Sequence, residues 1–148
     1  MKRIEEQARR LDQEYQAIGQ LFDQFCQQAG ALAEQYHFFN WPDYEDSPPL
    51  SRAFTLLGEP RELRLRCQPG ERSALNGLIQ VVSEDGTIDA SLGFRADGQL
   101  LLESGKLLDN PPGLLLKLLD NPPGLLLKLL LGAVWQHKPQ DEITGQPH

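Results

Sequence analysis

Apolar and aromatic residues recur along the first 37 residues at spacings that alternate between four and three. One register holds Ile4, Leu11, Ile18, Phe25 and Leu32, and the other holds Ala8, Tyr15, Phe22, Ala29 and Tyr36. We call this row of ten side chains the seam. Its period is that of one face of an α-helix, and it predicts a long amphipathic helix over residues 3–37. Gly19 and Gly30 each weaken such a helix by about 1 kcal/mol relative to alanine, so a break near either is expected.

The residues that flank the seam change in character halfway along it. The early flanks are polar, whereas the later ones include Leu21, Cys26 and Ala33. A narrow apolar stripe suits contact with one other helix, and a broad stripe suits packing against a sheet. We therefore expect the first half to reach beyond the domain and the second half to lie in the core. Two interpretations stay open, a single helix covering its own sheet and a dimeric coiled coil; the self-association residues would be Ile4, Leu11, Tyr15 and Ile18.

An aromatic, proline-rich stretch follows over residues 38–60. Pro42, Pro48 and Pro49 exclude a regular element over residues 38–50. The aromatic rings either fold back onto the domain or form a recognition loop for a protein partner; they are Phe38, Phe39, Trp41 and Tyr44. Residues 51–57, SRAFTLL, are predicted to form a short helix that ends at Gly58.

Alternation of apolar and polar residues predicts an antiparallel sheet over residues 61–104. In residues 62–67 the side chains of Leu63, Leu65 and Cys67 point inward, while Arg64 and Arg66 point outward. Residues 75–83 form a second strand, and Glu84-Asp85-Gly86 is a hairpin turn. Residues 88–94 form a third strand with Ile88 inward and Asp89 outward, and residues 99–102 form a fourth after the turn at residues 96–98.

An exact tandem duplication covers residues 106–127. Residues 106–119 and 117–130 both read KLLDNPPGLLLKLL, which we interpret as the product of an 11-residue duplication of natural or engineered origin. Each unit carries a helix start, because Asp or Asn caps a helix and proline fits its first turn. The second copy predicts a closing helix over residues 122–136, with Trp135 as a buried ring, and the first predicts a short helix over residues 114–119. The leucines are apolar almost all round the helix, so they are either core or a partner surface formed by Leu115, Leu119, Leu126 and Leu130.

Together these elements predict an α+β fold: a long N-terminal helix, an antiparallel meander of about four strands, and a closing C-terminal helix. We expect one domain over residues 1–138 and a disordered polar tail over residues 139–148. The same order of elements is similar to that of some small dimeric nucleoid-associated proteins and acidic secretion chaperones, a likeness of arrangement only.

Charge and cysteine content narrow the classes of function. The net charge is −7, and an acidic chain repels phosphate backbones, which argues against binding of nucleic acid. The N-terminus does not have the pattern of a secretory signal, and no apolar run is long enough to span a bilayer. Two cysteines, Cys26 and Cys67, match no metal or redox spacing, so we expect reduced thiols in a cytoplasmic protein.

Catalytic and cofactor motifs are missing from the sequence. The three histidines are scattered, and neither a phosphate-binding loop nor a nucleophile elbow is present, so no cofactor or metal is expected. Cys26 with His37 is the one conceivable nucleophile and base. The acidic run of Asp43, Glu45 and Asp46 lacks the ligand pattern of a calcium loop.

Three functions therefore remain. The first is a small cytoplasmic protein-binding or regulatory module, adaptor or chaperone-like, that forms a homodimer. The second is a nucleic-acid-binding protein that uses one arginine-bearing sheet face, formed by Arg61, Arg64, Arg66 and Arg72. The third is an enzyme with an unrecognised site.

Overall fold

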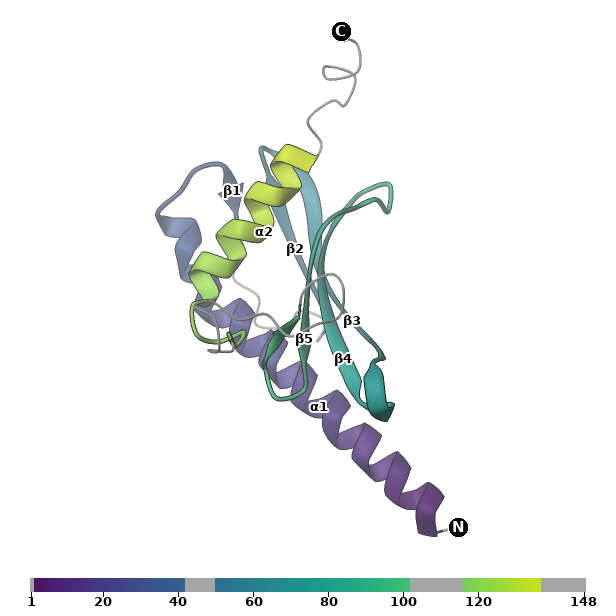
Figure 1. The fold of residues 1–148 in the computed structure, drawn as a ribbon. Coiled ribbons are helices and arrows are strands. Elements are labelled where there is room, and N and C mark those ends of the chain that lie inside the picture. Colours follow the sequence, from purple (N-terminus) through teal and green to yellow (C-terminus); the bar gives the residue numbers. More distant parts are fainter. Residues whose placement is uncertain (1, 42–49, 102–115, 137–148) are drawn as a thin grey trace, which may run out of the picture.

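The computed structural model describes residues 2–41, 50–101 and 116–136. Two helices lie on one face of a six-stranded antiparallel sheet whose strand order is the chain order, β1 to β6 (Figure 1). The elements are α1 (Lys2–Gly30), the 3-10 turn η1 (Ala31–Glu34), β1 (Phe39–Asn40), β2 (Ser51–Leu56), β3 (Glu59–Pro69), the 3-10 turn η2 (Glu71–Ser73), β4 (Leu75–Ser83), β5 (Ile88–Arg95), β6 (Leu100–Leu101) and α2 (Pro122–Gln136). The predicted α+β class is confirmed.

The sheet has two more strands than the four predicted. One is β1, which lies in the stretch where no regular element was expected; it ends before Pro42 and pairs with β2. The other is β2, because residues 51–57 are not a helix. Residues 51–56 form β2, which pairs with all of Glu59–Arg64 in β3. The side chains of Arg52, Phe54 and Leu56 are buried, while those between them are more exposed, so the period is two. Pairing with a long neighbouring strand outweighs the local preference of this short segment. The remaining predicted strands are confirmed, and β4 has the predicted bounds.

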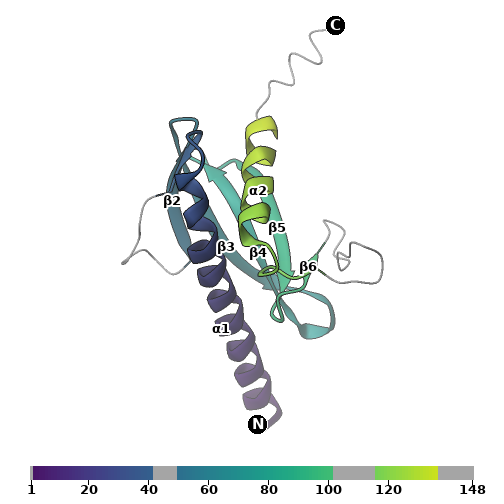
Figure 2. The same cartoon turned by 90° about the vertical axis from the view of Figure 1, so that its left-hand side faces the viewer.

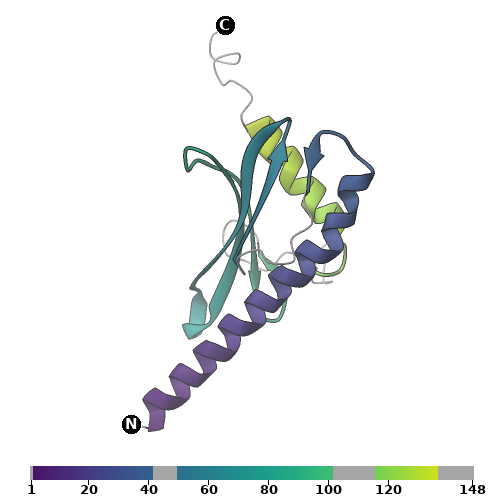
Figure 3. The same cartoon turned by 180° about the vertical axis from the view of Figure 1, so that it is seen from behind.

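Only the second half of α1 packs on the sheet. Residues 2–13 are all exposed, and burial begins at Ile18 and continues through Phe22, Phe25 and Ala29. Figure 3 shows the N-terminal part of α1 running past the end of the sheet. The expectation that the first half of this helix reaches beyond the domain is confirmed. The α-helix ends at Gly30 and η1 begins at Ala31, in agreement with the break expected near Gly30.

Helix α1 is held close to the sheet where β4 lacks a side chain. A Cβ at Gly77 of β4 would lie 2.5 Å from Phe94 of β5 and 2.8 Å from Ile18 of α1. Both of these side chains are fully buried. Figure 2 shows α1 and α2 side by side over the strands, and their facing sides enclose the core with the sheet.

A β-bulge reverses the predicted orientation at the start of β5. Val81 pairs with Ala90, but Val82 pairs with Ile88, so one extra residue is accommodated in β5. Ile88, predicted to point inward, is 47% exposed, and Asp89, predicted to point outward, is 4% exposed. Strict alternation fails here because a bulge brings two successive residues to one side of the strand.

Helix α2 has the predicted bounds and the predicted cap. The Asn121 side-chain oxygen accepts a hydrogen bond from the backbone N–H of Gly124 at 3.2 Å. Residues 116–120 do not continue the helix expected over 114–119; instead Lys117 forms a bridge with Gln99, and residues 118–120 form a turn. Trp135, predicted to be buried, is 64% exposed because it lies on the outer side of α2. The tail over residues 139–148 and most of the first copy lie outside the described residues.

Two glycines of α1 should respond to alanine in opposite directions. A Cβ at Gly19 meets nothing within 4 Å, so Gly19→Ala should stabilise the protein by about 0.5–1 kcal/mol through helix propensity. A Cβ at Gly30 would lie 2.9 Å from the Trp41 indole, so Gly30→Ala should cost about 1–3 kcal/mol. Urea unfolding monitored by circular dichroism measures both changes. A stabilising Gly30→Ala would mean that the indole does not pack on this turn.

Deletion of residues 106–116 restores a single copy and leaves Lys117 onward unchanged. The contacts at risk belong to Leu116, whose carbonyl accepts a hydrogen bond from the N–H of Leu100 and whose side chain is half-buried. Gly105 would take this place and could supply the carbonyl. We expect the fold to be retained and the free energy of unfolding to be unchanged or higher, since a shorter connection has a lower ordering cost. A loss of several kcal/mol in denaturant titration would show that both copies belong to the core.

Candidate functional site

The projecting part of α1 carries an exposed apolar surface. Ile4, Leu11 and Tyr15 are 61%, 52% and 44% exposed, and Ala8 lies between them on the seam. Beside them is a groove of about 350 Å³, lined by Ala8, Leu11, Asp12, Tyr15, Cys67 and Leu75. The groove therefore lies where the helix leaves the β3–β4 end of the sheet. We call Ile4, Ala8, Leu11 and Tyr15 together with this groove the projecting surface.

A hydrogen bond fixes the helix at the inner edge of the projecting surface. The Glu14 carboxylate accepts a hydrogen bond of 3.0 Å from the backbone N–H of Leu75, the first residue of β4. Arg10, one turn earlier, lies 3.8 Å from the same carboxylate. The turn of α1 that contains Tyr15 is therefore anchored, and the three turns before it extend from this point. Of the predicted self-association residues, Ile18 lies inside the core and the other three lie on the projecting surface.

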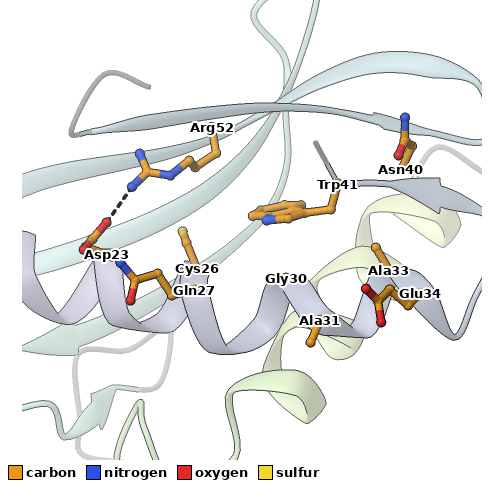
Figure 4. Close-up of a pocket in the computed structure, with 10 residues that line it drawn as sticks. All are labelled: Asp23, Cys26, Gln27, Gly30, Ala31, Ala33, Glu34, Asn40, Trp41 and Arg52. Carbon is orange, nitrogen blue, oxygen red and sulfur yellow. Dashed lines mark hydrogen bonds and ion pairs between the residues drawn. The ribbon is translucent and has the colours of Figure 1, made fainter. Parts of the chain in front are cut away.

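A second cavity, of about 540 Å³, lies between the last turns of α1 and the strands β1 and β2 (Figure 4). Its lining includes Asp23, Cys26, Gly30, Trp41 and Arg52. The Trp41 ring lies between the helix and β2, with its centroid 5.3 Å from that of Phe54. Gly30 makes this position possible, because a side chain there would occupy the space of the indole.

The charges in this cavity are paired with one another. Arg52 donates a hydrogen bond of 2.8 Å to the Asp23 carboxylate, and its guanidinium carbon lies 5.5 Å from the centroid of the Phe22 ring. Gln27 donates to the second oxygen of the same carboxylate. Arg52 also donates to the backbone carbonyl of Ser51. This network joins α1 to β2 and satisfies a nearly buried guanidinium, which is a structural use of the charge.

The thiol in this cavity is not a nucleophile. Burial raises the pKa of Cys26 to about 12, an effect that the nearby Arg52 only partly opposes. Its hypothetical base, His37, is exposed, whereas Cys26 is 3% exposed. A thiolate is the reactive form of cysteine, so Cys26 is a packing residue.

Metal-binding geometry is likewise missing from the part of the chain that the structure describes. Across residues 2–41, 50–101 and 116–136, no three His, Cys, Asp or Glu side chains are grouped so that they could hold a metal ion. The acidic run of Asp43, Glu45 and Asp46 lies outside these ranges.

The aromatic residues predicted to bind a partner divide between core and cavity. Phe39 is buried, and Phe38 packs against it with the ring centroids 5.1 Å apart. The rings of Tyr36 and Phe38 meet edge-on, with their centroids 5.8 Å apart. Trp41 lines the cavity, and Tyr44 lies outside the described residues. In this cluster the rings fold back onto the domain, which was the first of the two interpretations.

The leucines of the duplicated segment are mostly internal. Leu126 and Leu130 are fully buried between α2 and the sheet, so they are not on a free surface. Leu119 is half-buried against the core, and Leu115 lies outside the described residues. The apolar residues that α2 does expose are Leu131 and Trp135.

The four arginines of the nucleic-acid hypothesis do not share one face. Arg61 points to the helix-covered side, where its Nε lies 3.3 Å from the fully buried carboxylate of Asp89. Arg64, on the open side, donates a 2.8 Å hydrogen bond to Glu62. Arg66 is exposed, and Arg72 lies in the η2 turn at a φ of 56°. The basic groups are thus divided and partly neutralised, which leaves a phosphate-binding face without support.

Sequence reasoning missed the residues that complete these sites. The sequence does not predict the pairing of Arg52 with Asp23, because it favours a helix over residues 51–57, and strict alternation places Asp89 outward where the structure has a bulge. Cys67 and Leu75 were placed correctly on strands, but nothing in their spacing indicates that they border the projecting part of α1. One feature of the sequence does indicate the projecting surface. The seam continues without a break from Ile4 into the core, and its flanks are polar only in the first half.

No family model, no curated protein and no solved structure matches the chain. Within the described residues, no helix is long and apolar enough to cross a membrane.

The two thiols should react very differently with Ellman's reagent. With a pKa near 12, only about one Cys26 in ten thousand is a thiolate at pH 8, and the fraction rises only as the pH approaches 12. Cys67 is half-buried at the groove, and burial raises its pKa as well. We expect slow modification of one thiol in the folded chain and of two after denaturation. Cys67→Ser should leave no reactive thiol; rapid labelling of Cys26 would contradict its burial.

Proposed function

We propose that this chain is a small cytoplasmic protein-binding module, adaptor or chaperone-like, that self-associates through the projecting surface. The observation that carries the proposal is the exposure of Ile4, Leu11 and Tyr15 on a helix that is otherwise anchored to the domain. A large exposed apolar patch on a soluble domain is typical of a contact surface.

The occupant that best fits this surface is a second copy of the chain. The heptad spacing along the seam is the pattern that packs one helix against another. A second copy carries the same pattern and is always present at the same concentration as the first. An isologous contact also covers both exposed surfaces at once. Cys26 and Cys67 are both free thiols, which supports the cytoplasmic part of the proposal.

Placing a charge on the seam should dissociate the dimer without unfolding the domain. Leu11→Glu introduces a carboxylate at the centre of the contact, and Leu11 is 52% exposed in the single chain. We expect the wild-type protein to dimerise with a dissociation constant on the order of micromolar, since a contact formed by a few exposed side chains of one helix is smaller than a standard interface. The variant should weaken dimerisation at least about tenfold, equivalent to about 1.4 kcal/mol. Sedimentation velocity over a concentration series measures both constants.

Gln13→Glu is the matched control, because Gln13 lies on the opposite side of the same helix turn and is exposed. It adds the same charge and should leave the dimer intact. Circular dichroism should show that both variants are folded. Wild-type protein that remains monomeric at several hundred micromolar would refute the proposal.

A further inference from the structure

We propose that two copies pair antiparallel, with Ile4 of each copy seated in the groove of the other beside Tyr15, Cys67 and Leu75. This inference rests on the proposed self-association and adds its geometry. The projecting surface lies on the same side of α1 as Ile18 and Phe22, because the seam continues from one set to the other. Farther along α1, this same side of the helix packs on the sheet. The sheet therefore limits the direction in which a partner helix can lie.

A parallel partner would collide with the domain. In a parallel pair, the helix of the second copy would run past Tyr15 along the side of α1 that the sheet of the first copy covers from Ile18 onward (Figure 3). The sheet of the second copy would occupy the same region. An antiparallel partner instead places its domain beyond the N-terminus of α1, where Figures 1 and 3 show no described element. Only this direction keeps the two sheets apart.

The side chains of the seam also match in the antiparallel direction. When Ile4 lies opposite Tyr15 of the second copy, Ala8 lies opposite Leu11 of that copy. Each pair forms one layer of the contact, and the twofold axis repeats both layers. Each layer combines a smaller with a larger side chain, and the bulkier Ile4–Tyr15 layers lie outside the narrower Ala8–Leu11 layers. The groove accounts for the outer layer, because Cys67 and Leu75 extend the apolar lining around Tyr15 and provide a seat for Ile4. Together, α1 and the β3–β4 end of the sheet thus form a deeper groove than the surface of a helix alone.

The charged flanks set the conditions for a test. Antiparallel pairing brings Glu5 near Asp12 of the second copy, a contact between like charges, while Arg10 and Glu14 already pair within each helix. Salt at about 0.3 M screens exposed charges over a few ångströms and leaves apolar contacts in place. Crosslinking experiments on the dimer should therefore be done at this ionic strength and at a protein concentration above the dimer dissociation constant.

Disulfide trapping of Ile4→Cys tests the geometry. Antiparallel pairing predicts an intermolecular bond between Cys at position 4 and the native Cys67 of the second copy, identified by mass spectrometry of the linked peptides. A disulfide requires Cα atoms within about 7 Å, whereas in parallel pairing position 4 is displaced about 16 Å along the helix from the level of Tyr15. The control is Ile4→Cys in a Cys67→Ser background, which should lose the crosslinked dimer.

Three results are distinguishable. A bond between position 4 and Cys67 that disappears with Cys67→Ser supports the antiparallel arrangement. A bond between the two copies of position 4 that persists in the Cys67→Ser background overturns it while leaving self-association intact. A protein that stays monomeric in sedimentation and forms neither bond refutes the self-association itself, and the inference with it.

Discussion

The close approach of α1 to the sheet at Gly77 governs the rest of the architecture. Ile18 of α1 and Phe94 of β5 both occupy the space that a side chain at position 77 would fill. This contact fixes where α1 meets the sheet, and thus how much of the helix extends past the β3–β4 end. The Glu14 hydrogen bond to Leu75 lies one turn before Ile18 and sets the same boundary. Because the boundary falls at Tyr15, the seam divides into a buried half and an exposed half.

The sequence predicted the elements whose pattern is long and regular. The seam predicted α1, alternation predicted β3 to β5, and the Asn121 cap predicted the start of α2. Short segments were less informative, because β2 depends on pairing with β3 rather than on its own residues. The bulge before Ala90 and the exposure of Trp135 depend on how strands and helix meet, and no local pattern encodes either.

The candidate site could be predicted in part for the same reason. Polar flanks correctly separated the projecting half of the seam from the core half, although Ile18 falls on the inner side of the boundary. The groove joins residues about 60 positions apart, so it exists only once α1 lies along β3 and β4. The four arginines illustrate the converse: they are near neighbours in sequence, yet strand alternation and the partner Asp89 place them in different environments.

The docking of α2 has a consequence for the way the chain folds. Residues 111–119 and 122–130 have the same sequence, so either can present the same leucines to the sheet during folding. The two registers differ only after position 130, where the native segment continues with Leu131–Gln136 and the other meets Asp120 to Pro123. Ala133, 1% exposed, is the buried residue that the alternative register lacks, since Pro122 would take its place. A helix docked eleven residues out of register would bury the same leucines, so the final turns of α2 are what distinguish the native register from this alternative.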